Sequence, residues 1–485
     1  MSSSHVVVFL SILGYAHGGN PLVPGVGMAD PNIRLMNGTF FVWATHDFSV
    51  NNTAFEMRDW WVWSSPDLVA WTLQSRVVPT EVLLWDDVAT ECWATDAALR
   101  HGKYYFYLSV GPASIGVVSA DSPSGPWTDP LGRPLLDDAL AKSLQPPTTF
   151  RDPAVFEDDD GRWYLIAGVF EYYIVELSAD MVSVASAPRH VEVVGAYGAC
   201  GANRTDDKPF LHKRKGLYYL SWGCFYGTAA SLFGPYITVG SVIDTARIAP
   251  DFRIGGAKEP WYTAEDYTDR HGSFLQAHGQ WYFATNDRSH SGDAGHEGYF
   301  RDTVMGYIHF RANGSMQPME IDGAGVGSHD ARRWIEAERF FSGSDGVDQS
   351  VDLRAEGGGE GFAAGNLSNG SVLIYRNVAH LLELGSSPTL IFRTAAPTLR
   401  GAAALAVTIR VSDDVAGRCI IPPTSSWASF ADVPCPLTLR SPRRSPPEGP
   451  VTLTLTITLA GGATVGASHE LMRLDRFVFI SNATP

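Results

Sequence analysis

Five acidic or histidine side chains recur along the chain at matching positions, each six to nine residues ahead of a glycine that opens an aromatic segment. They are Asp30, Asp96, Asp152, Asp207 and His271. The segments that follow read Gly-x-aromatic-aromatic and begin at Gly38, Gly102, Gly161, Gly216 and Gly279. Carboxylates and imidazoles are the usual proton donors and acceptors of enzymes. If the repeats fold alike, these side chains converge, and we expect an active site where they meet.

The repeat also indicates which elements position these side chains. Successive leading residues are 55–66 residues apart, and the segments between them read as short strands joined by turns, with alternation clear at residues 103–108 and 217–222. Repeated strand–turn–strand units are typical of propeller blades, whose innermost strands surround a central channel. The sequence therefore predicts an all-β fold with a five-bladed β-propeller over residues 20–325. It contains no long stripe of helical period that would favour a parallel α/β fold.

A chain of 485 residues exceeds what one core usually supports, so a second domain is expected. The aromatic strand openings vanish after residues 325–333, and residues 334–481 are rich in Gly, Ser and Thr with β alternation. This pattern favours a β-sandwich. The N-terminal segment, residues 1–19, contains a short apolar run that reads either as a secretory signal sequence or as an outer strand of the first domain.

Charge and cysteine content narrow the functional class. The formal net charge of −16 argues against nucleic-acid binding, which calls for basic patches, and no stretch is long enough to span a membrane. Five cysteines cannot all pair, and Cys419 with Cys435, flanking one short loop, form the expected disulfide. Seven Asn-x-Ser/Thr triplets are compatible with glycosylation. We expect an extracellular monomer without an organic cofactor.

The ordered motifs resemble glycoside hydrolase family 43. The resemblance covers roughly residues 20–325 and rests on residues 29–31 (Ala-Asp-Pro), 93–96 (Trp-Ala-Thr-Asp), 151–156 (Arg-Asp-Pro-Ala-Val-Phe), 271–274 (His-Gly-Ser-Phe) and 300–301 (Phe-Arg). It implies a five-bladed propeller acting on arabinose- or xylose-containing oligo- and polysaccharides. One departure concerns the fourth blade, where the family's glutamate is replaced by Asp207 and a lysine follows it.

The resemblance also implies roles for three carboxylates. Inverting hydrolysis needs a base that activates water and an acid that protonates the leaving oxygen. Asp30 is the implied base and Asp207 the implied acid, while Asp152 orients the acid and raises its pKa. Aspartate is one methylene shorter than glutamate, and Lys208 is available for an ion pair with Asp207. The alternative is therefore that Asp207 no longer works as a general acid. Asp206 and Glu259 are alternative acids.

Other residues receive roles by the same resemblance. His271 is expected to face a calcium ion in the channel, Trp93 to stack on a sugar ring, and Arg301 to bind substrate or brace a carboxylate. Alternatively, His271 is a structural histidine, Trp93 belongs to the core, and Arg301 forms an ordinary surface ion pair.

The C-terminal segment resembles carbohydrate-binding module family 6. The similarity lies in residues 335–338 (Ile-Glu-Ala-Glu), in the Cys419 to Cys435 loop with Trp427, and in residues 474–477 (Leu-Asp-Arg-Phe). It implies a structural calcium held by Glu336, Glu338 and Asp475, since hard cations take oxygen ligands, and a sugar-stacking role for Trp427. Asn366 stands where a second stacking aromatic is typical.

Two other functions are alternatives to an inverting arabinofuranosidase or xylosidase. A retaining β-fructosidase shares the Arg-Asp-Pro segment, but its Glu-Cys motif follows that segment, whereas here Glu91-Cys92 precedes it. A catalytically weakened or inactive glycan-binding propeller is the stronger alternative, because of the change to Asp207.

Overall fold

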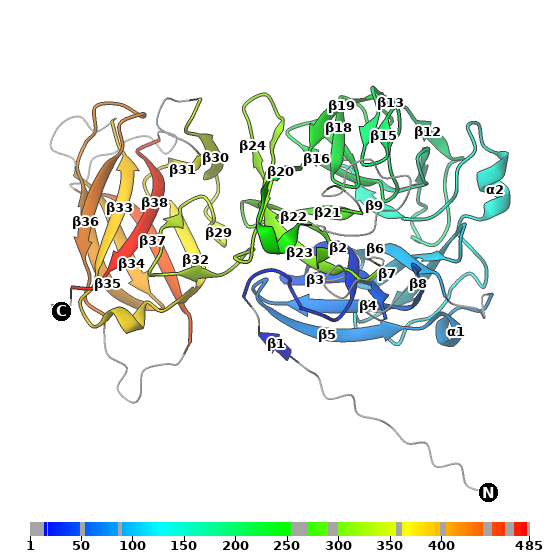
Figure 1. Ribbon diagram of the computed structural model, residues 1–485, viewed down its shortest axis with the longest axis horizontal. Helices are drawn as coiled ribbons and strands as arrows, with labels where there is room; N and C mark the ends of the chain where they lie inside the picture. The colour runs from blue at the N-terminus through cyan, green and yellow to red at the C-terminus, as the bar shows by residue number, and fades with distance from the viewer. Residues whose placement is uncertain are drawn as a thin grey trace, which may run out of the picture.

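The computed structural model describes residues 14–16, 18–48, 54–85, 90–253, 267, 269–289, 299–355, 361–397, 404–439, 449–460 and 470–482. Glu259 and the apolar run within residues 1–13 lie outside these ranges. The described chain is almost entirely β-structure, arranged as two bodies that lie side by side (Figure 1). The prediction of an all-β fold is therefore confirmed.

Within the described ranges the first body contains five sheets of three or more strands, each built mainly from consecutive antiparallel strands, and three two-stranded sheets. Sheet one holds β2 (Met28–Met36), β3 (Thr39–Asp47), β4 (Met57–Ser65) and β5 (Ala70–Val77), with β1 (Gly14–Ala16) at its edge. Sheet two holds β6 (Cys92–Arg100), β7 (Lys103–Val110) and β8 (Ser114–Ala120). Sheet three holds β9 (Ala154–Glu157), β10 (Trp163–Ala167), β11 (Tyr172–Glu176) and β12 (Arg189–Val191). Sheet four holds β16 (Phe210–Arg214), β17 (Leu217–Trp222), β18 (Phe225–Ala229) and β19 (Tyr236–Ser241), with β13 (Val193–Val194) parallel to β19. Sheet five holds β21 (Gly272–Ala277), β22 (Gln280–Asp287) and β23 (Asp302–Tyr307).

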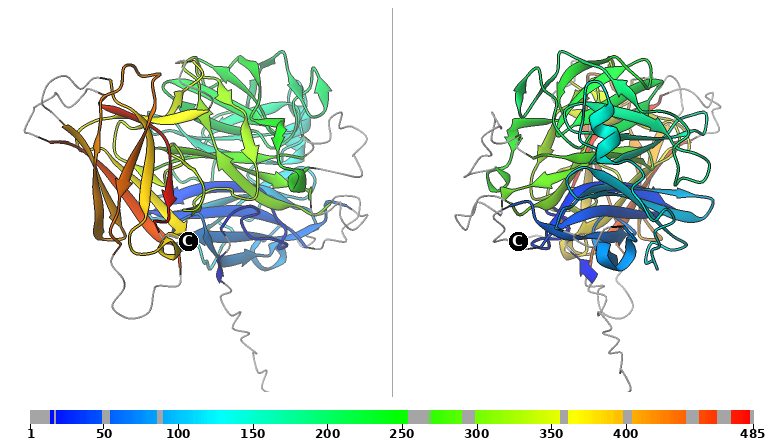
Figure 2. Two further views of the ribbon diagram at one scale, coloured as in Figure 1. Left: turned by 60° about the vertical axis from the view of Figure 1, so that its left-hand side comes forward. Right: turned by 90° about the vertical axis from the view of Figure 1, so that its right-hand side faces the viewer.

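The first strands of these sheets are neighbours in cyclic order. Strand β2 packs beside β6, β6 beside β9, β9 beside β16, β16 beside β21, and β21 again beside β2. In the left view of Figure 2 the first body, coloured blue to green, lies beside the second body, coloured yellow to red. Residues far apart in sequence are therefore brought together at the ends of the first strands.

The repeated glycine has a steric reason. The five glycines of the Gly-x-aromatic-aromatic segments all have left-handed φ angles between 77° and 86°, a region that a Cβ disfavours. Each lies in the tight turn that joins the first strand of its sheet to the second, as Gly161 does between β9 and β10. The aromatic residues that follow pack inward, and Phe40, Phe106, Tyr219 and Phe283 are buried between sheets. The turn thus fixes the register of each hairpin.

The second body consists of two sheets facing one core. One sheet holds β27 (His329–Asp330), β29 (Ser342–Gly343), β32 (Val372–Ala379), β37 (Val451–Ala460), β34 (Ala404–Val411) and β35 (Asp414–Ile421). The other holds β30 (Asp348–Asp352), β31 (Phe362–Leu367), β38 (Met472–Ile480), β33 (Thr389–Ala395) and β36 (Ala431–Pro436), with β28 (Ile335–Glu336) beside β38. A single hydrophobic cluster fills the space between them. The predicted disulfide between Cys419 and Cys435 is present, and Cys92, Cys200 and Cys224 are buried.

Short elements complete the chain. They are helices α1 (Pro79–Val82) and α2 (Asp138–Ser143), the 3-10 turns η1 (Pro250–Phe252) and η3 (Leu382–Leu384), and strands β14 (Tyr197–Gly198), β15 (Gly201–Ala202), β20 (Ile243–Ile248), β24 (His309–Phe310), β25 (Met316–Gln317) and β26 (Met319–Ile321). No helix in the described ranges has the length and apolar character of a membrane span.

Candidate active site

Three of the repeated carboxylates and the histidine line one cavity of about 420 Å³ in the first body. Asp30 lies in β2, Asp152 just ahead of β9, Asp207 just ahead of β16, and His271 directly before β21. All four are therefore placed by the beginnings of first strands, as the repeat predicts.

The fifth repeated residue does not join them. Asp96 is fully buried in β6, where it forms an ion pair with Arg34 and accepts a hydrogen bond of 2.7 Å from the Val155 N–H. Asp96 does not line the cavity. The expectation that all five side chains share one site is thus wrong for Asp96, because a neighbouring arginine neutralises it below the cavity.

The backbone beneath the site is held in an unusual conformation. Asp30, Asp152, Lys208 and Asp269 have φ angles of 47°, 57°, 51° and 53°, in the left-handed region that costs roughly 1–3 kcal/mol for a non-glycine residue. Neighbouring groups fix this geometry at Asp152, whose N–H donates to Ser109 Oγ at 2.7 Å while its Oδ2 accepts from the Lys208 N–H at 3.1 Å. Strain of this kind gathers where side chains must point at a ligand.

Asp30 is held as an ionised carboxylate. Its Oδ1 accepts hydrogen bonds from Asn286 Nδ2 at 3.0 Å and from Arg301 at 2.9 Å. Burial alone raises the pKa of Asp30, but the charges of Arg301, His271 and Lys208 outweigh it and bring the pKa well below its usual value. A carboxylate in this state is suited to accept a proton from water.

Arg301 is a buried hub for three carboxylates. Its guanidinium donates to Asp47 at 2.9 and 3.0 Å, to Asp30 at 2.9 Å and to Asp269 at 3.2 Å. Burial raises the pKa of Asp47 to about 6 even though Arg301 opposes it. Of the two roles that the sequence predicts for Arg301, bracing of Asp30 is the one supported by these contacts.

Asp207 meets His271 rather than Lys208. His271 Nε2 lies 2.5 Å from Asp207 Oδ1, and Arg151 lies 3.8 Å from Asp207 Oδ2. Burial raises the pKa of Asp207, but His271 and Arg151 outweigh it, so the pKa is lowered overall. Lys208 turns its Nζ to the carbonyl of Thr95 at 3.3 Å, and no ion pair joins it to Asp207 within the described chain.

The carboxyl groups of Asp152 and Asp206 have a raised pKa, in contrast to that of Asp207. Burial, followed by the charge of Asp207, raises the pKa of Asp152 to about 6 and that of Asp206 to about 7. Asp206 also lines the cavity. Since close carboxylates titrate together, the group formed by Asp152, Asp206 and Asp207 holds at least one proton on the acid side of neutrality.

Aromatic and basic side chains form the walls. Trp93 lines the cavity, donates from Nε1 to the carbonyl of Phe55 at 2.8 Å, and carries the Arg151 guanidinium 4.8 Å above its ring. Phe55 and Phe170 line the same cavity. The ring of Trp93 is therefore in contact with Arg151, and Trp93 also packs against a hydrophobic cluster of the first body.

The surroundings of His271 do not fit a directly bound calcium ion. His271 shares one compact group of potential ligands with Asp30 and Asp269, and another with Asp206 and Asp207. Calcium takes six to eight oxygen ligands, whereas each group offers two carboxylates and a nitrogen. Burial lowers the pKa of His271, but Asp207 and Asp269 raise it well above its usual value.

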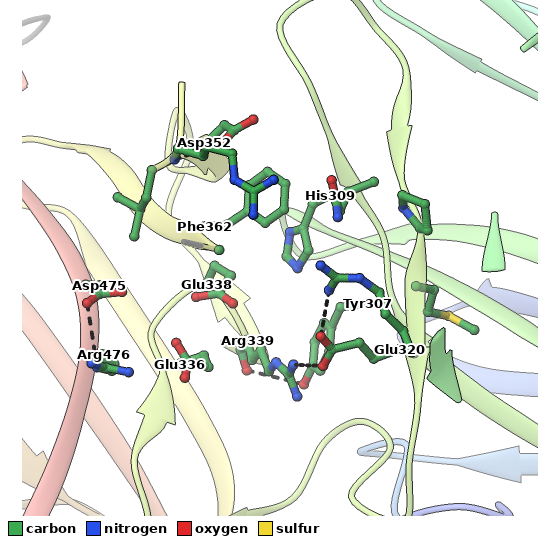
Figure 3. A pocket seen from close by; sticks show the side chains of 18 of the residues that line it. Tyr307, His309, Glu320, Glu336, Glu338, Arg339, Asp352, Phe362, Asp475 and Arg476 are labelled. Atoms are coloured by element: carbon green, nitrogen blue, oxygen red, sulfur yellow. Dashed lines mark hydrogen bonds and ion pairs between the residues drawn. The ribbon is translucent and has the colours of Figure 1, made fainter. Parts of the chain in front are cut away.

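The three C-terminal residues predicted to bind calcium line a second cavity, of about 560 Å³, between the two bodies (Figure 3). Glu338 is buried, and its Oε2 has no hydrogen-bond partner in the described chain. Burial raises the pKa of Glu336 and of Glu338. Asp475 instead lies 3.0 Å from Arg393 and 3.7 Å from Arg476. Glu336 and Glu338 offer the type of ligand atom that a hard cation takes, but with Asp475, which pairs with two arginines, they do not form one of the compact ligand groups found among the described residues.

The aromatic residue predicted to bind sugar on the second body is partly covered. The Arg473 guanidinium lies 4.7 Å from the centre of the Trp427 ring and is anchored by Glu470 at 3.0 Å. Asn366, which replaces the second aromatic, donates from its side chain to the carbonyl of Gly346. Trp427 therefore presents one ring face without an aromatic partner at position 366.

Comparison with known proteins identifies the family. The description glycosyl hydrolases family 43 matches residues 19–316, more than half of the chain. The chain belongs to this family. A β-D-galactofuranosidase of Aspergillus niger is 28% identical over 335 residues, 64% of this chain and 86% of that protein. An arabinoxylan arabinofuranohydrolase of Bacillus subtilis is 26% identical over 389 residues, 70% of this chain and 72% of that protein. A crystal structure of a family 43 enzyme from Xanthomonas citri complexed with xylose has a TM-score of 0.50 and 25% identity, and covers 64% of this chain and 95% of that one.

Sequence reasoning missed several residues of this family 43 site. Asp47, Asp269, Arg151 and Arg204 received no role, although Asp47 and Asp269 contact Arg301 and the other two line the cavity. Arg151 directly precedes Asp152, and Asp269 lies two residues before His271. The residues just ahead of each repeated side chain are therefore the sequence signal that could have found them. Asp47 and Arg204 occupy no repeated position, and no sequence signal marks them.

Proposed function

We propose that this family 43 glycosidase is an inverting enzyme of the α-L-arabinofuranosidase or β-xylosidase type, acting as an exo- or debranching hydrolase on plant- or algal-type polysaccharides. The observation that carries the proposal is the cavity in which an ionised Asp30 faces Asp207 across His271. The named activity of the Bacillus subtilis relative and the xylose complex of the Xanthomonas citri enzyme support a pentose-containing substrate.

The spacing of Asp30 and Asp207 is compatible with inversion. His271 lies between them, 3.4 Å from Asp30 Oδ1 and 2.5 Å from Asp207 Oδ1. With the width of the imidazole ring, these gaps place the two oxygens at most about 8 Å apart, and inverting enzymes separate their carboxyls by roughly 6.5–9.5 Å. In this mechanism Asp30 takes a proton from water as the water attacks the anomeric carbon. The leaving oxygen receives its proton from Asp207.

The proton that Asp207 donates comes from the group of carboxyls formed by Asp152, Asp206 and Asp207. Asp207 is held ionised by His271 in the free enzyme, whereas Asp152 and Asp206 are the carboxyls whose pKa is raised. A proton held by this cluster reaches Asp207 when the leaving group approaches and separates Asp207 from His271. Asp152 thereby supports the acid without contacting the sugar oxygen itself.

A glycan-binding protein without efficient catalysis is the second candidate. It is favoured by the ion pair between His271 and Asp207, which opposes protonation of the acid. Aryl glycosides discriminate the two functions, because an aryl leaving group needs little protonation. Turnover of aryl α-L-arabinofuranosides or β-D-xylosides together with arabinoxylan supports the hydrolase. Oligosaccharide binding without turnover of any of them supports the binding protein.

Replacement of the base tests the hydrolase directly. Asp30→Asn removes the charge but retains a residue type that tolerates the left-handed backbone at this position. We expect turnover to be lost while the unfolding midpoint shows a folded protein. Asp160→Ala, which removes an exposed carboxylate in the turn after β9, is the matched control and should keep wild-type activity. An active Asp30→Asn variant contradicts the assignment of the base.

The architecture supports finer proposals. The cyclic order of the five sheets is what a five-bladed propeller over residues 20–325 requires, and the two facing sheets suit a sandwich module over residues 334–481 related to carbohydrate-binding module family 6. Glu336 and Glu338 would hold a structural calcium in that module, and Trp427 would contact sugar. A secreted location agrees with the disulfide between Cys419 and Cys435.

A further inference from the structure

Two arginines at the cavity have donors that nothing in the described chain uses. Arg151 and Arg204 both line it. The Nε of Arg151 is buried without a hydrogen-bond partner in the described chain. The Nη2 of Arg151 lies 3.8 Å from Asp207 Oδ2, which is beyond hydrogen-bonding distance. Arg204 is exposed, and no hydrogen bond or ion pair to its guanidinium occurs among the described residues. Arg301, the remaining arginine of the cavity, is by contrast saturated by three carboxylates.

Aromatic side chains hold both guanidinium groups in place. The Cζ of Arg151 lies 4.8 Å from the centre of the Trp93 ring, and the Cζ of Arg204 lies 4.1 Å from the centre of the Phe170 ring. Stacking occupies the flat face of a guanidinium and leaves its edge, which carries the N–H donors, free to bind. The two arginines are thus positioned in advance, and little side-chain entropy is lost when a ligand binds them.

The position of Arg151 indicates which part of a substrate it meets. Asp207 is the group that faces the leaving oxygen, and Arg151 lies beside it. A ligand of Arg151 therefore belongs to the leaving-group side of the scissile bond. The only ion pair of Arg151 among the described residues is the long one to Asp207, at 3.8 Å, and Arg204 has none there. Their natural partner is an anion, because a guanidinium binds carboxylate or sulfate through two parallel hydrogen bonds.

From this geometry we infer that the enzyme takes acidic glycans, in which a carboxylate or sulfate on the leaving-group sugar is bound by Arg151 and Arg204. This inference rests on the proposed hydrolase function. It adds the substrate class: a branched or terminal sugar attached next to a uronic acid or a sulfated sugar.

The test compares oligosaccharides that differ only in charge. One carries a glucuronic acid residue beside the hydrolysed sugar, the second is the same compound with its carboxylate reduced to the alcohol, and the third carries a sulfate ester instead. We expect kcat/KM to be about tenfold higher for at least one anionic compound than for the reduced one, the gain typical of a partly exposed charge-assisted hydrogen bond. Raising the salt concentration from about 0.05 M to about 0.5 M should reduce this ratio through screening.

Variants assign the preference to the two arginines. Arg204→Ala and Arg151→Ala should each bring the ratio of anionic to neutral kcat/KM close to one. Arg189→Ala is the matched control, because the Cζ of Arg189 also lies 4.1 Å from a phenylalanine ring, that of Phe233, yet Arg189 does not line the cavity. It should leave both activities and their ratio unchanged.

The outcomes separate the two proposals. A ratio near one in the wild type, with the neutral compound turned over, overturns the acidic substrate class and leaves the hydrolase standing. A preference that survives both arginine replacements overturns the assignment of Arg151 and Arg204. Failure to hydrolyse any of the three compounds or the aryl glycosides overturns the proposed function itself.

Discussion

Arg301→Ala is expected to be among the most destabilising single replacements in the protein. Arg301 is almost fully buried and binds Asp47, Asp30 and Asp269 at once, through contacts of 2.9 to 3.2 Å. Its removal leaves three buried carboxylates without their cation. Breaking a buried ion pair by removing one partner costs about 3–5 kcal/mol, a large share of the roughly 5–15 kcal/mol that stabilises a typical domain.

The same replacement should change the pH dependence of catalysis. Burial raises the pKa of Asp30, and the charge of Arg301 is the largest single effect that lowers it. Without it, burial dominates, the pKa rises, and the acid limb of the kcat/KM profile moves to higher pH. Arg301→Lys retains the positive charge but loses the planar guanidinium that contacts three carboxylates. The loss of stability and the shift of the acid limb should therefore both be smaller than for Arg301→Ala.

Urea unfolding measures the loss of stability, with the same dependence of the unfolding free energy on urea concentration applied to the wild type and the variants. Arg332→Ala is the control, since Arg332 pairs with Asp330 at 2.9 Å on the surface, where such a pair contributes about 0–1 kcal/mol. If Arg301→Ala costs no more than Arg332→Ala and leaves the acid limb in place, the description of Arg301 as the counter-charge of Asp30 is refuted.

Three further predictions follow from individual contacts. Asp207→Ala should lower kcat on arabinoxylan by at least about a hundredfold but affect aryl glycosides much less, because general acid catalysis contributes about 10²–10⁴-fold; equal losses on both substrates would contradict its role as acid. Because burial and Asp207 raise the pKa of Asp206 to about 7, the folded protein holds this proton more tightly than the unfolded chain, so this contribution to stability is complete below about pH 4 and disappears as the pH rises to about 7. Asp206→Asn should accordingly flatten the fall in Tm measured across that interval, and an unchanged pH dependence would count against it. Replacing Cys419 and Cys435 together by alanine should cost about 3 kcal/mol in chemical unfolding, from the loop of 16 residues that the disulfide closes, with hydrolysis of small aryl glycosides retained.

The repeat in the sequence was sufficient to predict the main sheets of the first body and four of the residues that line the cavity. The turns at Gly38, Gly102, Gly161, Gly216 and Gly279 require glycine for steric reasons, so the hairpins are encoded locally. Asp30, Asp152, Asp207 and His271 then meet because the first strands lie in cyclic order.

Pairing between distant residues could not be predicted in this way. Asp96 occupies an equivalent repeat position, yet Arg34 on the neighbouring strand removes it from the cavity. Asp207 pairs with His271 although Lys208 is its neighbour in sequence, because the left-handed backbone at Lys208 turns the ammonium toward Thr95. Such choices depend on the three-dimensional arrangement of charges that no single repeat contains.

The configuration of the sugar at the moment of release tests the central claim most directly. Proton NMR of an aryl α-L-arabinofuranoside or β-D-xyloside during the first turnovers, before mutarotation, identifies the anomer that is formed. Attack by a water molecule activated by Asp30 predicts the anomer opposite to that of the substrate. Release of the same anomer would mean that a carboxylate attacks the sugar itself, and would contradict the roles given to Asp30 and Asp207.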